Sequence, residues 1–203
     1  MSARVVFITH PEVVIDPAVP VVDWPLSERG RARMTAGSAW AWAAGIGAIW
    51  ASTERKATDA AAILGAARGI GFATRGDLGE NDRSSTGYLA RAEFEATADL
   101  FFARPDQSVR GWERAVDAQA RIVAAVNAVL AAPGDVATTG DVAAPGADVA
   151  VVAHGAVGAL LLCALEGAAI SRAWDQPPGG GGFYFVFGRA DRRVVHRWRA
   201  IDG

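Results

Sequence analysis

The sequence predicts an α/β fold with a mainly parallel central sheet, helices on both faces and an antiparallel hairpin at the carboxyl terminus. Short apolar, β-prone runs alternate along the chain with segments of helical periodicity. Strands separated by helices favour parallel pairing in a sheet that is covered on both sides. The last two β-prone runs, "GFYFVF" and "RVVHRWRAI", flank the turn-forming residues 188–192, and this pattern indicates a hairpin.

The first half of the chain supplies three strands and two helices. Residues 5–8 form the first expected strand, and Ser27 is a plausible N-cap for a helix that runs to about Ala44. A second strand over 48–52 leads into a helix over 54–64, which Gly65 ends. Residues 70–74 form the third strand. This order is the repeating pattern of a doubly covered sheet.

The second half continues the alternation after two helical segments. We expect helices over 91–103 and 111–131, the second with apolar residues at helical spacing. Residues 133–149 carry two Pro-Gly pairs and are expected to form a surface loop rather than a domain boundary. A strand over 148–153 and a helix over 156–165 follow.

Composition limits the class of protein. The chain has 203 residues, of which 51% are hydrophobic, so we expect a single folded domain over 1–203. A net charge of −2 gives no general attraction to nucleic acid or to acidic membranes. No signal peptide is evident, and the longest apolar stretch is interrupted by His154, so we expect a cytoplasmic protein without a membrane span. The sole cysteine, Cys163, is expected to be a buried bystander.

Two histidines occupy equivalent places in the predicted sheet. His10 follows the first strand, and His154 follows the strand over 148–153. In a parallel sheet both would lie at the carboxyl edge, where ligands bind and where helix N-termini favour anions. Ser52, Arg55 and Lys56 follow another strand and would bring a hydroxyl and two cations to the same edge. The pattern predicts an anion pocket that contains two histidines, with phosphate as the expected anion.

Five segments in this order resemble the histidine phosphatase superfamily, whose members have phosphoglycerate mutase-like folds. The family's opening Arg-His-Gly-Glu corresponds to Thr9-His10-Pro11-Glu12. Its later motifs correspond to "PLSERG" at 25–30, "STERKA" at 52–57, "LGE" at 78–80 and His154-Gly155. The segments span nearly the whole chain. The composition, rich in Ala and Arg, also resembles that of a protein from a GC-rich bacterium.

The resemblance implies a phosphomonoester hydrolase that works through a phosphohistidine, without a cofactor or a metal. His10 would be the nucleophile, and His154 would stabilise the transferring phosphoryl group. Glu80 would be the general acid and base, with Asp82 as a nearby substitute. Residues expected to bind the small phosphorylated substrate are Thr9, Ser52, Arg55, Lys56, Arg83 and Gly155.

Three departures from the family pattern bear on activity. Thr9 replaces the arginine before the nucleophile, Lys56 replaces the later arginine, and Pro11 replaces a glycine. Lysine binds phosphate as a point charge and lacks the two-pronged geometry of a guanidinium. The alternative function is therefore a weakened or inactive phosphatase-like protein that binds a phosphorylated ligand. A metal hydrolase is less favoured, because the two histidines lack the close helical spacing common in such sites.

Several of these residues also have purely structural interpretations. Alone, His10 would be read as a hydrogen-bonded loop residue, and Glu80 as part of a solvated turn. The "GGGG" run at 179–182 is expected to be a flexible entry to the last hairpin rather than a phosphate-binding loop. Trp24 and Trp174 lie in predicted loops and leave a homodimer open. His196 is expected to face solvent from the hairpin.

Overall fold

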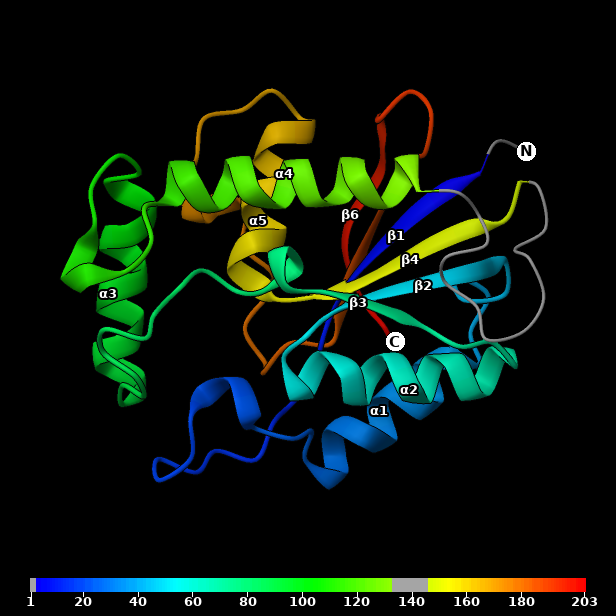
Figure 1. Cartoon of the computed structure of the whole chain (residues 1–203), viewed down its shortest axis with the longest axis horizontal. Coiled ribbons are helices and arrows are strands. Elements are labelled where there is room, and N and C mark those ends of the chain that lie inside the picture. Colours follow the sequence, from blue (N-terminus) through cyan, green and yellow to red (C-terminus); the bar gives the residue numbers. More distant parts are fainter. Residues whose placement is uncertain (1–2, 133–145) are drawn as a thin grey trace.

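The computed structural model describes residues 3–132 and 146–203, and its centre is one six-stranded sheet (Figure 1). The strand order is β3-β2-β4-β1-β5-β6. The first four strands in chain order run parallel, β5 is antiparallel to β1, and β6 is antiparallel to β5. The strands are β1 (Arg4–Thr9), β2 (Ile46–Ser52), β3 (Ala73–Arg75), β4 (Asp148–Ala153), β5 (Phe183–Gly188) and β6 (Val194–Ala200). The predicted fold class is confirmed, including the terminal hairpin.

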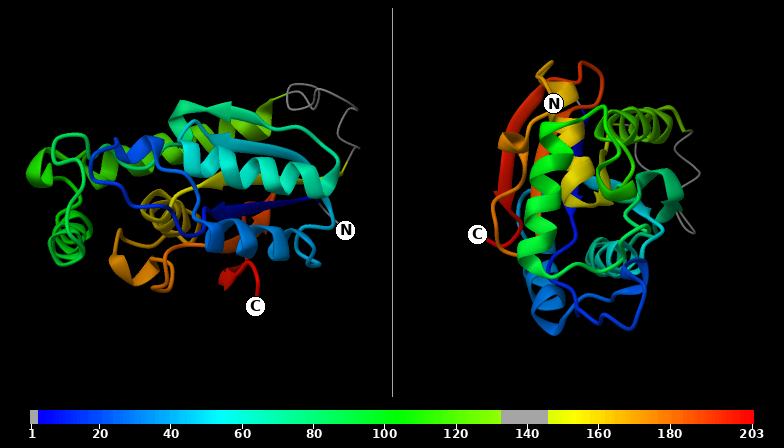
Figure 2. Two further views of the ribbon diagram at one scale, coloured as in Figure 1. Left: turned by 90° about the horizontal axis from the view of Figure 1, so that it is seen from below. Right: turned by 90° about the vertical axis from the view of Figure 1, so that its left-hand side faces the viewer.

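Helices cover both faces of the sheet (Figures 1 and 2). Helices α1 and α2 lie on one face and α4 and α5 on the other, whereas α3 lies beyond the carboxyl ends of the parallel strands. The α-helices are α1 (Glu28–Ser38), α2 (Arg55–Arg68), α3 (Arg91–Ala103), α4 (Ala115–Ala131) and α5 (Gly155–Leu165). Single 3-10 turns are η1 (Val21–Asp23), η2 (Gly76–Leu78), η3 (Val109–Gly111) and η4 (Arg172–Trp174).

Alternation along the parallel strands divides the core in two. On β1, Val5 and Phe7 pack against α4 and α5, whereas Val6 and Ile8 pack against α1 and α2. All four side chains are fully buried, which is expected of a parallel strand covered on both faces. Among the described residues, no helix is both long and apolar enough to cross a membrane. Cys163 lies in α5 and is buried, as expected.

The first helix is shorter than the sequence predicts. Ser27 caps α1 as expected, its hydroxyl accepting a hydrogen bond from the Gly30 amide at 3.0 Å. The helix ends at Ser38 rather than near Ala44, and Trp42 lies buried in the turn that follows. Its indole donates a hydrogen bond to the Ile201 carbonyl and stacks on Tyr184. Tertiary packing therefore overrides the helical tendency of the alanine-rich segment.

The helix predicted over 111–131 begins later, at Ala115. Arg110 and Gly111 both have positive φ, 55° and 82°, so the chain there forms a turn and cannot continue as a right-handed helix. Trp112 was read as part of the helical stripe, but it is buried in a separate cluster beside Phe101. Of the predicted loop over 133–149, residues 133–145 lie outside the described residues.

The four consecutive glycines at 179–182 form a tight turn that holds the start of the site. All four have positive φ, and the Gly182 amide donates a hydrogen bond to the His10 carbonyl at 3.1 Å. A Cβ on Gly181 would lie 2.1 Å from the same carbonyl oxygen. The run is therefore required by close approach to the backbone of His10, which the sequence interpretation as a flexible entry did not include.

Gly181→Ala should destabilise the fold by at least about 2 kcal/mol, because it combines a left-handed φ with a backbone clash. Denaturation in urea measures this change. Gly87→Ala is the matched control, since Gly87 also has positive φ (58°) but has open space around it. Equal, small losses in both variants would show that the contact with the His10 carbonyl is not tightly packed.

Candidate functional site

The two histidines lie side by side at the carboxyl edge of the sheet. In the parallel pair of β1 and β4, Thr9 is opposite Ala153, so the next residue of each strand is a histidine. The His10 amide donates a hydrogen bond to the Ala153 carbonyl at 3.2 Å. The rings of His10 and His154 have centroids 5.2 Å apart and planes at 67°. The structure thus brings together the two residues that the sequence placed at equivalent strand ends.

The hydrogen bonding of His10 fixes the tautomer of its ring. Its Nδ1 lies 2.9 Å from the Pro11 carbonyl oxygen. A carbonyl can only accept, so Nδ1 carries the hydrogen in the neutral ring and Nε2 keeps a free lone pair. Burial, and then the charge of Lys56, lower the pKa of His10 to about 4. The imidazole is therefore neutral, and competent as a nucleophile, at neutral pH.

His154 is fully buried and has unused hydrogen-bonding capacity. Neither of its ring nitrogens has a hydrogen-bond partner among the described residues. Burial lowers its pKa well below the usual value, against the opposing charge of Glu54. Since buried polar atoms are normally paired, both nitrogens have the capacity to hydrogen-bond a polar group.

Glu54 is the central carboxylate of the site, and the sequence interpretation missed it. Its Oε1 lies 3.3 Å from Nε2 of His154 and accepts a hydrogen bond from the Glu80 amide at 2.9 Å. Its Oε2 accepts from Nζ of Lys56. Burial alone would raise the pKa of Glu54, but these neighbours hold it below its usual range. The side chain leaves the N-terminus of α2 uncapped and points at the histidines instead.

The predicted cations differ sharply in their surroundings. Lys56 is buried, and its Nζ donates both to Glu54 and to the Val21 carbonyl, the latter at 2.8 Å. Arg55 is exposed and makes no ion pair with any described residue. Arg83 is half-buried over the rings of Phe94 and Trp112, at 5.1 and 5.9 Å from their centroids. Burial is the main cause of the lowered pKa values of both histidines, and the charge of Arg83 lowers them further.

Thr9 is tied to the protein rather than left open. Its buried hydroxyl donates a hydrogen bond to Oε1 of the Gln176 side chain at 2.6 Å and accepts one from the Phe183 amide at 3.0 Å. Gln176 also packs against the start of α5, where a Cβ on Gly155 would lie 2.5 Å from its amide nitrogen. Gln176 therefore joins the end of β1 to the N-terminus of α5, a link that had no sequence signature.

The acids at 80 and 82 have different positions. The Glu80 carboxylate accepts hydrogen bonds from the Ala156 and Val157 amides, at 3.2 and 3.1 Å, in the first turn of α5. This places Glu80 beside His154, which precedes that helix. Asp82 is exposed, and its carboxylate accepts from the Ser84 amide at 2.8 Å.

Ser52 is buried, with its hydroxyl oxygen accepting from the Glu54 amide at 3.2 Å.

Asp175 is a further titratable group near the site that sequence reasoning did not select. Burial, together with the charges of Glu80 and Glu95, raises its pKa to about 6 against the effects of the Gln176 amide and Arg172. Nothing in the local sequence marks Asp175 or Gln176, because their importance comes from contacts across the fold. Glu54, in contrast, stands between predicted site residues in "STERKA" and had a sequence signal in its position.

The arrangement combines two neutral imidazoles with charges of both signs. The ionised Glu54 opposes Lys56 and Arg83 around the two histidines. Such a site can transfer an electrophilic group to Nε2 of His10. No cluster of three or more His, Cys, Asp or Glu side chains suited to a metal ion occurs within 3–132 and 146–203.

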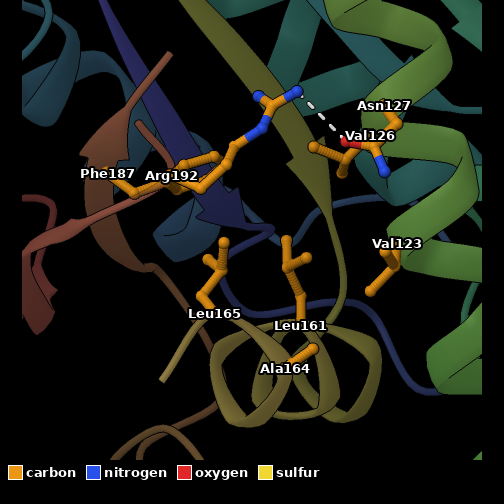
Figure 3. Close-up of a pocket in the computed structure, with 8 residues that line it drawn as sticks. All are labelled: Val123, Val126, Asn127, Leu161, Ala164, Leu165, Phe187 and Arg192. Carbon is orange, nitrogen blue, oxygen red and sulfur yellow. Dashed lines mark hydrogen bonds between the residues drawn. The ribbon is translucent and has the colours of Figure 1, made fainter. Parts of the chain in front are cut away.

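A separate hollow lies at the opposite end of the sheet (Figure 3). It is lined mainly by apolar side chains of α4 and α5, with Arg192 bonded to Asn127 at its rim. Phe187, also in its lining, pairs with Val5 at the start of β1, whereas His10 follows the end of that strand. The hollow therefore shares no residue with the histidine site.

A search of family models finds a match over residues 16–201 to the histidine phosphatase superfamily (branch 1). The match covers most of the chain and includes "STERKA", Glu80 and His154, whereas His10 lies before it. No curated protein gives a match.

Solved structures show the same fold at low sequence identity. A mycobacterial glucosyl-3-phosphoglycerate phosphatase, in complex with inorganic phosphate, is 23% identical and superposes with a TM-score of 0.74, with 100% of both chains covered. The YhfR protein of Bacillus stearothermophilus is 21% identical with a TM-score of 0.75, covering 97% of this chain and 95% of its own. At these identities the likeness concerns the fold.

Titration of His10 should give a midpoint near pH 4 rather than 6.5, because burial and Lys56 disfavour the imidazolium. Nitrogen-15 NMR of the free protein measures the midpoint and also reports whether Nδ1 carries the hydrogen. With the folded pKa below the unfolded one, stability should decrease as pH falls from about 6.5 towards 4. A midpoint near 6.5 would place His10 in a solvated setting and contradict the proposed geometry.

Proposed function

Because this chain belongs to the histidine phosphatase superfamily, we propose that it hydrolyses small phosphomonoesters through a phosphohistidine formed on His10. The observation that carries the proposal is the orientation of that ring. Its Nδ1 is held by the Pro11 carbonyl, which leaves Nε2 as the free nucleophilic atom beside the unpaired nitrogens of His154. A chain folded only for stability would have no need of two such rings in contact.

The proposed reaction has two steps. Nε2 of His10 attacks phosphorus, the bond from phosphorus to the ester oxygen breaks, and Glu80 gives its proton to the leaving alkoxide. In the second step Glu80 takes a proton from water, the hydroxide attacks phosphorus, and the nitrogen–phosphorus bond breaks. Phosphate leaves, and His10 and Glu80 return to their starting states. Asp82 is less well placed for this role, since its carboxylate is exposed and bound to Ser84.

The remaining expected site residues support the phosphoryl group in different ways. His154 would hydrogen-bond its oxygens, and Arg83 would supply charge that no described carboxylate neutralises. Lys56 contributes charge that Glu54 largely offsets. Thr9 and Gly155 would act through Gln176, as positioning residues, and Ser52 through the Glu54 backbone. Arg55, exposed at the start of α2, would meet the ester's other substituent.

The proposed substrate class is supported by the site and by a solved structure of similar fold. A similar structure is that of a glucosyl-3-phosphoglycerate phosphatase, and it was solved with inorganic phosphate. That relationship, at 23% identity, supports a small phosphorylated ester as substrate here and leaves the ester's other substituent open. A panel that contains sugar phosphates, phosphoglycerates and aryl phosphates would identify it.

His10→Ala should reduce phosphate release by a factor on the order of 10³ or more, because the nucleophile is lost. The measurement is phosphate release from the panel of esters by wild type and variant. His196→Ala is the matched control: it removes another histidine, one in the terminal hairpin. Full activity in His10→Ala would contradict the proposal. Absence of turnover in the wild type, with bound phosphate still detected, would support the alternative of a non-catalytic binding protein.

Arg83→Gln should reduce kcat/KM by roughly tenfold to a hundredfold, because it removes a half-buried site cation that has no carboxylate partner among the described residues. Steady-state kinetics on the preferred ester provides the measurement. Arg91→Gln, at the exposed start of α3, controls for loss of one surface charge. Unchanged kinetics in Arg83→Gln would assign the phosphate-binding charge to Lys56 or Arg55.

A further inference from the structure

We propose that Glu54 makes the site specific for a phosphoryl group that carries one proton, so that monoanionic phosphate groups bind and dianionic ones are rejected. This inference rests on the proposed function, because it concerns how the same pocket receives the phosphoryl group. It assigns to Glu54 the role of a specificity-determining residue.

Glu54 lies where a phosphoryl group between the histidines would meet it. Its Oε1 is 3.3 Å from Nε2 of His154, a nitrogen that has no hydrogen-bond partner among the described residues. The Glu54 side chain is only 10% exposed, so little water is present to screen its charge. A phosphoryl oxygen that reaches His154 must therefore come into contact with, or close to, the Glu54 carboxylate.

The contacts of Glu54 fix it in that place. Lys56 binds one carboxylate oxygen, and the Glu80 amide binds the other at 2.9 Å. Lys56 is itself held by the Val21 carbonyl and is 3% exposed. Moving Glu54 aside would leave a buried ammonium without its counter-ion, which is strongly unfavourable. The pocket therefore keeps its carboxylate when a ligand enters.

Hydrogen-bonding chemistry then decides between the two forms of the ligand. A dianionic phosphoryl group has only acceptor oxygens, as does an ionised carboxylate, so the two repel each other at contact. A monoanionic group has one P–OH, which can donate to Oε1 of Glu54, while its other oxygens face His154 and Arg83. One proton thus converts a repulsive contact into a hydrogen bond to a charged acceptor.

The charge on the surrounding groups matters for the test, because a titrating protein group would imitate this effect. The cations of Lys56 and Arg83 act on both histidines, and the Glu80 carboxylate is held by amides at the start of α5. The two histidines have pKa values lowered by burial, to about 4 for His10, and so remain neutral from pH 6 upwards. Glu54 remains ionised over the same range.

Asp175 is the exception, since its pKa is raised, mainly by burial, to about 6. The experiment therefore includes Asp175→Asn, which removes this titration without touching Glu54. A pH dependence that persists in Asp175→Asn belongs to the ligand, to the Glu54 contact or to Glu80, and the phosphorus-31 measurement below shows whether the proton is on the ligand or on the protein.

The probe is inorganic phosphate, and calorimetric titration from pH 6 to 8.5 measures its affinity. In the wild type the affinity for total phosphate should fall with the fraction of monoanion, approaching tenfold per pH unit above the second ionisation of phosphate. In Glu54→Gln the fall should become shallow, because the negative charge that repels the dianion is removed from the pocket while the cation of Lys56 remains. A fall as steep as that of the wild type in Glu54→Gln would overturn the assignment to this residue.

The phosphorus-31 chemical shift of bound phosphate locates the proton directly. At pH 7.5 to 8, where free phosphate is mainly dianionic, the bound signal should have the shift of the monoanion. A bound signal at the dianion position would overturn the proposal, even if affinity falls with pH, because it would place the proton on the protein. This measurement uses the wild type, so it does not depend on whether Glu54→Gln folds.

The outcomes separate this inference from the proposed function. Phosphate that binds with a dianion shift and an affinity independent of pH overturns the role of Glu54 but leaves the phosphatase proposal standing. Phosphate that fails to bind at every pH, together with no ester turnover, overturns the proposed function and this inference with it. Both proposals are supported if the wild type binds the monoanion with an affinity that falls as the pH rises, and if this fall becomes shallow in Glu54→Gln.

Discussion

The parallel pairing of β1 with β4 is the constraint on which the site depends. The register that puts Thr9 opposite Ala153 also brings the two following histidines into ring contact, 5.2 Å apart. A shift of one residue in that register would turn the buried side chains of β1 to the opposite face. The packing of Val5 and Phe7 on one face and of Val6 and Ile8 on the other therefore fixes the geometry of the site as well as the fold.

Buried charge gives the site its second constraint. Glu54 and Lys56 are both largely removed from water, and removing either partner would leave an uncompensated charge inside the protein. The negative charge of Glu54 offsets most of the attraction between Lys56 and an incoming anion. Arg83 lies over aromatic rings instead of beside a carboxylate, so it contributes more than Lys56 to the attraction of an anion.

The sequence predicted the architecture because each strand and helix carries its own periodic signal. It also predicted that His10 and His154 share one edge, since both follow buried strands in a parallel sheet. It failed where tertiary contacts decide: Trp42 shortens α1, and Gln176 reaches Thr9 from a distant loop. Glu54 was missed for a different reason: an anion pocket favours cations, so the carboxylate within "STERKA" was not among the expected ligands.

The departures at Thr9 and Lys56 become consistent with each other once Glu54 is included. Thr9 supplies no charge, and its hydroxyl is held by Gln176 and Phe183. Lys56 supplies charge, but Glu54 offsets it within the same pocket. The missing charge at Thr9 and the carboxylate of Glu54 both lower the positive potential beside His10. A pocket with lower positive potential is matched to a ligand of lower negative charge, and this agreement between independent positions favours altered selectivity over a simple loss of binding.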